Sequence, residues 1–97
     1  MNLKVMKRHL MKPHIKTYLK HFKYGEQDVI LCESCSRPAV DVHHVKYKSR
    51  GGTDDIENLI GLCRKCHDLA HNETLKESDL LLIHRYFLAG SRKQFIK

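Results

Sequence analysis

Two pairs of cysteines have the spacing of metal ligands. Cys32 and Cys35 form one Cys-x-x-Cys pair, Cys63 and Cys66 form another, and 27 residues separate the pairs. A two-residue spacer turns both thiolates of a pair toward one point, and structural zinc takes four such ligands in a tetrahedron. We therefore expect a four-cysteine structural zinc site, with free or disulfide-paired cysteines as the alternative.

Four of the eight histidines form a second pattern. His67 and His71 are four residues apart in a predicted helix over residues 64–72, so both rings lie on one face, where they can share a metal ion. The side chain of Cys66 leaves this helix about 100° away from that of His67. One helix can therefore contribute ligands to two different ions.

His43 and His44 are neighbours near the end of a predicted strand over residues 39–45. Adjacent strand residues point to opposite faces, so these two rings cannot easily bind the same ion. One of them would bind metal, and the other would be available as a general base, because an imidazole titrates near neutral pH. A single histidine is more simply explained as a surface or packed residue, and it is the combination with the cysteines that favours a site.

The elements around these residues predict a small α+β fold. A helix should begin at Pro13 and end just before Gly25, because its apolar residues recur at helical spacing: Ile15, Tyr18, Leu19 and Phe22. Residues 29–31 read as a short strand before the first cysteine pair, and residues 46–55 read as a loop that contains Gly51-Gly52. The apolar run Ile56, Leu59, Ile60 and Leu62 then leads into the second pair.

A last helix should begin near Thr74 or Ser78, either of which could cap it, and should run through Ala89. Its apolar residues do not form one clean stripe, so the sequence leaves its buried face open. A single domain over residues 1–97 is therefore expected in three parts. These are a basic arm and helix (1–25), a zinc-stapled core (29–72), and a C-terminal helix with a basic tail (74–97).

The composition narrows the class of partner. The 97 residues suit one domain, and the formal charge of +7 favours a polyanion such as nucleic acid. No apolar run approaches the roughly 20 residues that cross a bilayer, and the basic N-terminus lacks the apolar stretch of a secretory signal. We expect a cytoplasmic protein without membrane contacts, in which four cysteines are more often metal ligands than disulfides.

The segments AVDVHHV, RGGTDDIENLIGLC and RKCHDLAH occur in that order between residues 39 and 71. Together with the cysteine pairs they resemble the HNH endonuclease motif, also called the ββα-metal finger, over about residues 32–71. The resemblance implies a ββα-metal core, with a short antiparallel hairpin and a helix, between N- and C-terminal helices. Small free-standing members are often phage-encoded, which would place this one in the host cytoplasm.

The resemblance also implies roles for individual residues. His43, His67 and His71 would hold a catalytic divalent ion, and His44 would be the general base. Asn58 would brace the loop, and Asp41 would orient His44, which requires a twisted or bulged strand because the two lie on opposite faces. The four cysteines are absent from the colicin-type nucleases that share the histidine-rich pattern, so the chain combines features of two branches.

The implied reaction is hydrolysis of a DNA phosphodiester bond, as a nick or a double-strand cut. Three imidazoles favour transition ions, whereas relatives are also active with Mg²⁺, so Mg²⁺, Mn²⁺, Ni²⁺ and Zn²⁺ all stay open as the catalytic ion. Basic residues near the motif are candidate phosphate contacts with little sequence readout. They are Lys46, Lys48, Arg50, Arg64 and Lys65.

Two other functions are compatible with the residues. The first is a zinc-stapled DNA-binding module whose histidines do no catalysis. The second is an adaptor that works beside another nuclease, such as a phage packaging terminase.

Overall fold

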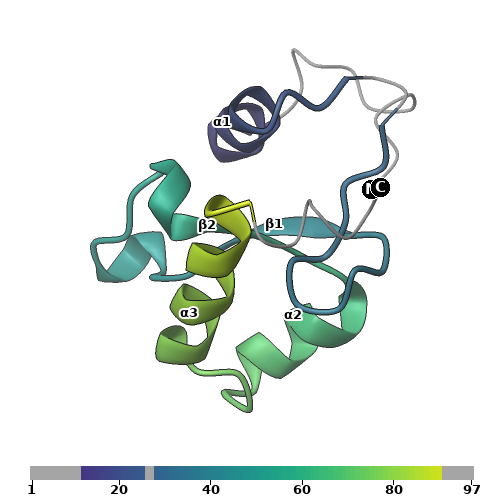
Figure 1. Ribbon diagram of the computed structural model, residues 1–97. Coiled ribbons are helices and arrows are strands. Elements are labelled where there is room, and N and C mark those ends of the chain that lie inside the picture. Colours follow the sequence, from purple (N-terminus) through teal and green to yellow (C-terminus); the bar gives the residue numbers. More distant parts are fainter. Residues whose placement is uncertain (1–11, 26–27, 91–97) are drawn as a thin grey trace.

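A two-stranded antiparallel hairpin lies at the centre of the computed structural model, which describes residues 12–25 and 28–90 (Figure 1). Strand β1 (Asp41–His44) pairs with β2 (Leu59–Leu62), and the register places Asp41 opposite Leu62 and His44 opposite Leu59. The expected α+β fold with a short hairpin is confirmed. Within the described residues, no helix has the length and apolar character needed to cross a membrane.

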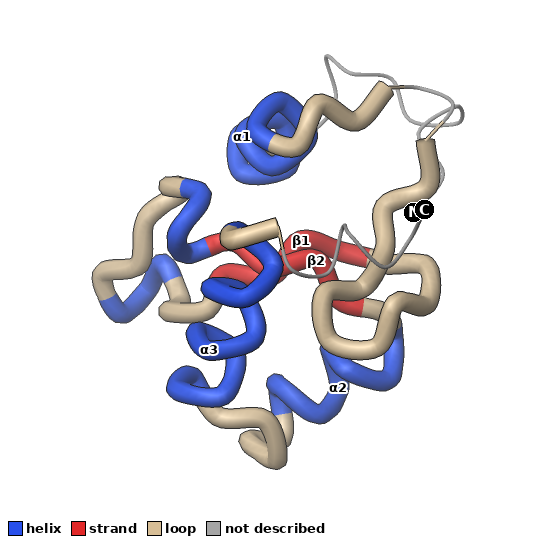
Figure 2. The backbone as a smooth tube through the Cα atoms, viewed as in Figure 1, coloured by secondary structure: helices blue, strands red, loops and turns tan. Residues whose placement is uncertain are grey.

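Helices cover both sides of the hairpin (Figure 2). Helix α1 (Pro13–His21) lies on one side, and α2 (Arg64–His71) and α3 (Glu77–Leu88) lie on the other. The core accordingly forms two clusters. One contains Tyr18 with Val42 and Leu59, and the other contains Ile60 and Leu62 with the α2 and α3 residues Cys66, Ala70 and Leu80. Alternate residues of each strand therefore contact different helices, as the two-residue period of a strand requires.

Residues 29–31 lie outside the named strands, so the strand expected there is wrong. Leu31 makes an isolated bridge with Pro38 instead. The chain reverses direction at once through the first cysteine pair, where the Cys32 N–H donates to the Arg37 carbonyl at 2.6 Å and the Ala39 N–H to the Ile30 carbonyl at 2.8 Å. The turn that brings the cysteines together leaves too little length for a regular strand.

The apolar stripe expected in α1 is confirmed, because Ile15, Tyr18 and Leu19 are buried. The helix ends at His21, four residues before the predicted glycine. Lys23 adopts φ 57°, and the Tyr24 N–H donates to the Leu19 carbonyl at 2.9 Å. A left-handed residue that closes the last turn is a common helix terminus, and here a lysine occupies it instead of glycine. The expected basic arm at residues 1–11 and tail at residues 91–97 lie outside the described residues.

The structure shows which face of α3 is buried, a point that the sequence left open. Its buried residues are Leu80, His84 and Phe87, a stripe at i, i+4 and i+7 that includes a histidine. Its N-cap is Lys76, whose backbone N–H donates to the Asp79 carboxylate at 3.0 Å. The prediction that Thr74 or Ser78 caps the helix is therefore wrong. The N-cap is Lys76, and Asp79 in the first turn accepts the hydrogen bond from its backbone N–H.

The loop between the strands contains two short 3₁₀ helices, η3 (Lys48–Arg50) and η4 (Ile56–Asn58). Gly51 follows η3 with φ 91°, a conformation that favours glycine. A Cβ on Gly52 would lie 1.8 Å from the Lys46 carbonyl oxygen, so no side chain fits there. The Gly-Gly pair thus allows the loop to fold back directly onto the residues that follow β1.

A charged network is buried between the helices. Glu33, inside the first cysteine pair, accepts a hydrogen bond from the Tyr18 hydroxyl at 2.6 Å and lies 2.7 Å from Nδ1 of His84. Nε2 of His84 donates to the Ile56 carbonyl at 2.5 Å. Burial lowers the pKa of His84, but the hydrogen bond and charge of Glu33 outweigh it, and the net pKa is raised. Both ring nitrogens of His84 face acceptors, a geometry that suits a ring donating from both and that ties α3 to the first cysteine pair.

Replacing His84 with alanine should destabilise the zinc-saturated protein by about 3–5 kcal/mol at pH 6, because Glu33 would stay buried without its partner. Chemical unfolding followed by circular dichroism measures the loss. Tyr86→Ala, at a position 64% exposed on the same helix, is the control and should change stability little. Because folding raises the pKa of His84, the stabilisation that His84 provides is complete at pH values below its pKa in the unfolded chain, near 6.5. It is lost as pH rises through the folded value, which NMR titration would locate. A loss under 1 kcal/mol would contradict the charged pair.

Candidate metal centres and active site

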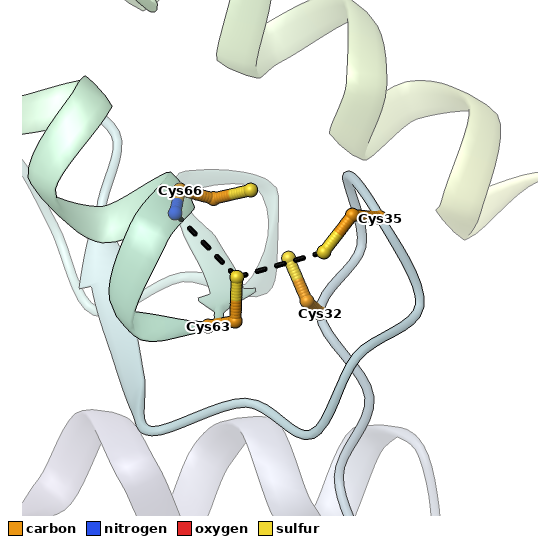
Figure 3. A group of neighbouring side chains, drawn as sticks. All are labelled: Cys32, Cys35, Cys63 and Cys66. Atoms are coloured by element: carbon orange, nitrogen blue, oxygen red, sulfur yellow. Dashed lines mark hydrogen bonds between the residues drawn. The ribbon is translucent and has the colours of Figure 1, made fainter.

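The four cysteines converge on one point from the loop of Cys32 and Cys35 and from the start of α2 (Figure 3). Their sulfur atoms all lie within 4.8 Å of one another, and Cys35 Sγ is 3.5 Å from Cys63 Sγ. That separation is far longer than a disulfide bond of about 2.05 Å and is close to the spacing of sulfurs around a tetrahedral ion. The clustering expected from the Cys-x-x-Cys spacing is confirmed, and the donor set suits a structural metal ion.

Cys63 is the N-cap of α2, and this position affects its acidity. Burial raises the pKa of Cys63, but the backbone N–H of Cys66 and the neighbouring thiols donate to its sulfur and lower the pKa to about 7. Burial raises the pKa of Cys66 to about 12. The pKa values of Cys63 and Cys66 are thus shifted in opposite directions, and a bound cation would favour the thiolate form of Cys66.

Three imidazoles meet on the other face of α2. Ligand atoms of His43, His67 and His71 all lie within 4.8 Å of one another, and the two Nε2 atoms of His67 and His71 are 3.1 Å apart. Two nitrogens bound at about 2.0–2.1 Å in a tetrahedron are roughly 3.3 Å apart. The β1 residue and the two α2 residues thus form a ready set of three metal ligands.

The protonation of these rings suits metal binding. Burial and the neighbouring His67 and His71 lower the pKa of His43 to about 4, and burial also lowers the pKa of His67. Neutral imidazole is the form that binds metal. The Tyr47 hydroxyl oxygen lies 3.3 Å from Nδ1 of His71, so a hydrogen bond donated by Nδ1–H to Tyr47 leaves the Nε2 lone pair directed toward His67.

His44 lies on the opposite face of β1, toward α1. Its Nε2 is 2.7 Å from Oδ1 of Asp54, and its ring centroid is 4.4 Å from that of His14. A carboxylate that accepts from Nε2–H leaves the lone pair on Nδ1, the state a general base needs. The hydrogen bond lowers the pKa of Asp54, so this carboxyl is ionised at neutral pH.

Asp54 makes the contact that was expected of Asp41. The Asp41 carboxylate accepts from the Val42 N–H at 2.8 Å. Its position in β1 places it on the face of His43, and the register of β1 with β2 is continuous from Asp41 to His44, without a bulge that would change its face. The loop between the strands supplies a carboxylate on the correct face instead.

Asn58 connects the two ends of that loop. Its Oδ1 accepts from the Lys46 N–H at 2.8 Å, and its Nδ2 donates to the Lys46 carbonyl at 3.1 Å and to the Thr53 carbonyl at 2.8 Å. The residue next to Thr53 is Asp54, so these bonds also position the carboxylate that contacts His44. The geometry matches a bracing side chain located away from the three imidazoles.

One open cleft of about 450 Å³ joins these groups. Its lining includes His14, His43, His44, Asp54, His67 and His71. Of the basic residues considered as phosphate contacts, Lys48 lines the cleft, 3.4 Å from Asp54. Arg50 and Arg64 pair with Glu77 at 3.3 Å and Asp68 at 4.0 Å, whereas Lys46 and Lys65 are exposed. The cleft is therefore lined by several imidazoles and by the ammonium group of Lys48.

A known family matches the part of the chain that contains most of these groups. Residues 32–73, which include all four cysteines and both sets of histidines from β1 and α2, match the family model described as HNH endonuclease. This segment belongs to the HNH endonuclease family. The HNH segment contains the hairpin and α2, whereas α1 and α3 lie outside it.

A longer similarity extends beyond the HNH segment. The chain is 28% identical over 85 residues to the "Type IV methyl-directed restriction enzyme EcoKMcrA" of Escherichia coli (strain K12). The alignment covers 76% of this chain and 29% of that protein, so the chain spans under a third of the relative's length. Neither comparison supports the expected link to a phage packaging terminase.

Three residues that line this cleft were not predicted from the sequence. Asp54 lies in the quoted RGGTDD segment, and its acidic side chain so close to the Gly-Gly pair was an available signal. Tyr47 follows the double histidine by three residues, and nothing in the sequence indicated that it belongs to the cleft. His14 lies at the start of α1, 30 residues before His44, and only the packing of α1 on β1 brings it into the cleft.

Proposed function

We propose that this chain is a metal-dependent HNH endonuclease that hydrolyses DNA phosphodiester bonds. One observation carries the proposal. The imidazoles of His43, His67 and His71 converge on a common point, while a fourth imidazole, that of His44, lies in the same cleft outside this group. A catalytic metal site needs few protein ligands, so that positions stay open to substrate, and it needs a separate base. Membership of the HNH family supports a nuclease in general terms.

His44 is the residue we assign as general base. Its Nδ1 would accept a proton from the water that attacks phosphorus, while Nε2–H stays bonded to Asp54 and stabilises the imidazolium that forms. Asp54 thus positions the base, and Asn58 positions Asp54. Asp41 lines the same cleft, and its carboxylate accepts a hydrogen bond from the Val42 N–H.

His43, His67 and His71 would hold the catalytic divalent ion. When bound, such an ion stabilises the negative charge that develops on the phosphate oxygens during cleavage. Three imidazoles favour a transition ion such as Zn²⁺ or Ni²⁺ over Mg²⁺, which prefers oxygen ligands. Tyr47 would fix the ring of His71 through its Nδ1.

The remaining assignments concern binding and stability. Cys32, Cys35, Cys63 and Cys66 would hold a structural Zn²⁺, since a closed set of four thiolates is typical of such sites. DNA would bind mainly through its phosphates, to Lys48 at the cleft and to the basic side chains Lys46, Arg50, Arg64 and Lys65 around it. Such contacts give affinity with little sequence readout.

A plasmid-nicking assay over a panel of divalent ions tests the proposal. Supercoiled DNA should be converted to nicked or linear forms in the presence of at least one of Mg²⁺, Mn²⁺, Ni²⁺ or Zn²⁺. Conversion should stop when a chelator removes the catalytic ion. His67→Ala should lower the rate at least 100-fold while zinc bound by the four cysteines is retained.

Protein that binds DNA but cuts it with none of these ions would overturn the enzymatic proposal. That result would favour the zinc-stapled DNA-binding module. Cleavage that survives the chelator and His67→Ala would remove the metal site from the mechanism.

A further inference from the structure

A second group of potential metal ligands lies beside the general base. His14, His44 and Asp54 each offer a ligand atom, and these atoms all lie within 4.8 Å of one another. The three come from α1, β1 and the loop between the strands, and all are partly exposed in the cleft. His14 lies outside the HNH segment. Two imidazoles and one carboxylate form a donor set that zinc and other transition ions bind well.

We propose that this group is a second, inhibitory site for Zn²⁺, distinct from the site of His43, His67 and His71. An ion held by His44 and Asp54 would take the place of the Nε2 proton that the two share at 2.7 Å. The two ligand atoms would move to roughly 3.3 Å apart, a change that small rotations of partly exposed side chains allow. His14 would complete the site from the other side of the cleft.

The surroundings of His14 suit a ligand. Burial lowers the pKa of His14, whereas the backbone carbonyl of Val42, on the same face of β1 as His44, acts in the opposite direction and is therefore placed to accept from a ring N–H. A neutral imidazole that donates from one nitrogen keeps its lone pair on the other, which is the usual arrangement of metal-binding histidines. The ring of His14 is held against that of His44 at 4.4 Å, so the two nitrogen donors are already close.

Occupation of this site would disable the base by a simple proton count. Neutral His44 carries one ring proton. With Nε2 bound to zinc, that proton must be on Nδ1, and Nδ1 can no longer accept a proton from water. This consequence rests on the proposed function, because it assumes that His44 is the base, whereas binding of the ion does not.

Metal counting tests the site without reference to activity. Zinc titrated into the full-length protein and measured by equilibrium dialysis should reach three ions per chain in wild type, the third binding most weakly. His14→Ala and Asp54→Asn should each weaken the third ion at least 10-fold and leave the other two in place. His21→Ala, which removes an exposed histidine from the same helix, is the matched control and should keep all three.

The kinetic arm measures inhibition of Mg²⁺- or Mn²⁺-supported nicking by added zinc. The zinc concentration for half inhibition should rise at least 10-fold in His14→Ala relative to His21→Ala, with each variant compared with its own uninhibited rate. Equal zinc binding by wild type and His14→Ala would overturn the site. Loss of the third ion without any change in inhibition would overturn the inhibitory role, and a protein with no nicking activity would fail the proposed function while metal counting still decides the site.

Discussion

Replacing His44 with alanine is expected to lower the rate of DNA cleavage by roughly 10²–10⁴-fold, the usual contribution of a general base. The reason is local: His44 is the cleft imidazole whose Nε2 is bonded to a carboxylate and whose Nδ1 is left as a proton acceptor. Plasmid nicking under single-turnover conditions, with the most effective divalent ion, measures the loss. DNA binding and the ions held by the four cysteines and by His43, His67 and His71 should stay at the wild-type level, because the ring is a ligand of neither ion.

Two further variants sharpen the interpretation of His44→Ala. His21→Ala removes an exposed histidine from α1 and should nick DNA at the wild-type rate. Asp54→Asn should lower the rate less than His44→Ala, since the base survives but its tautomer and orientation are no longer imposed. A His44→Ala protein that cuts normally would show that another group accepts the proton.

Replacing Cys66 with serine is expected to prevent folding at 25 °C. Structural zinc contributes an apparent free energy of about 10–16 kcal/mol in small domains, whereas the total stability of a domain is about 5–15 kcal/mol. The four sulfurs join the first cysteine loop to the start of α2, and Cys66 also belongs to the buried core. Loss of the ion would therefore remove the link between the first cysteine loop and α2.

Circular dichroism and zinc content together measure the effect of Cys66→Ser. The variant should lose its cooperative thermal transition and bind at least one zinc ion fewer than wild type. Arg37→Ala changes an exposed side chain in the loop of the first cysteine pair and should preserve both. A Cys66→Ser protein with an unchanged transition would show that the cysteines do not hold an ion on which the fold depends.

Patterns with a short period were readable from the sequence because local backbone geometry alone determines them. The Cys-x-x-Cys spacing, the i, i+4 placement of His67 and His71, and the opposite faces of His43 and His44 all appear in the structure as expected. So does the buried stripe of α1. In each case the residues concerned are at most four positions apart, or follow a helical repeat, and the fold needs only to form the element.

Contacts between distant segments were decided by the tertiary structure. The partner of His44 proved to be Asp54, ten residues away in a loop shaped by Gly52 and Asn58, while Asp41 was excluded by its face of the strand. The ring of His14 reaches His44 only because α1 packs on β1, and Glu33 meets His84 across 51 residues. The sequence by itself determined which residues could bind metal and on which face of its element each lies. Only packing decided which faces meet, because the separation of two residues along the chain carries no information about how helices dock on a sheet.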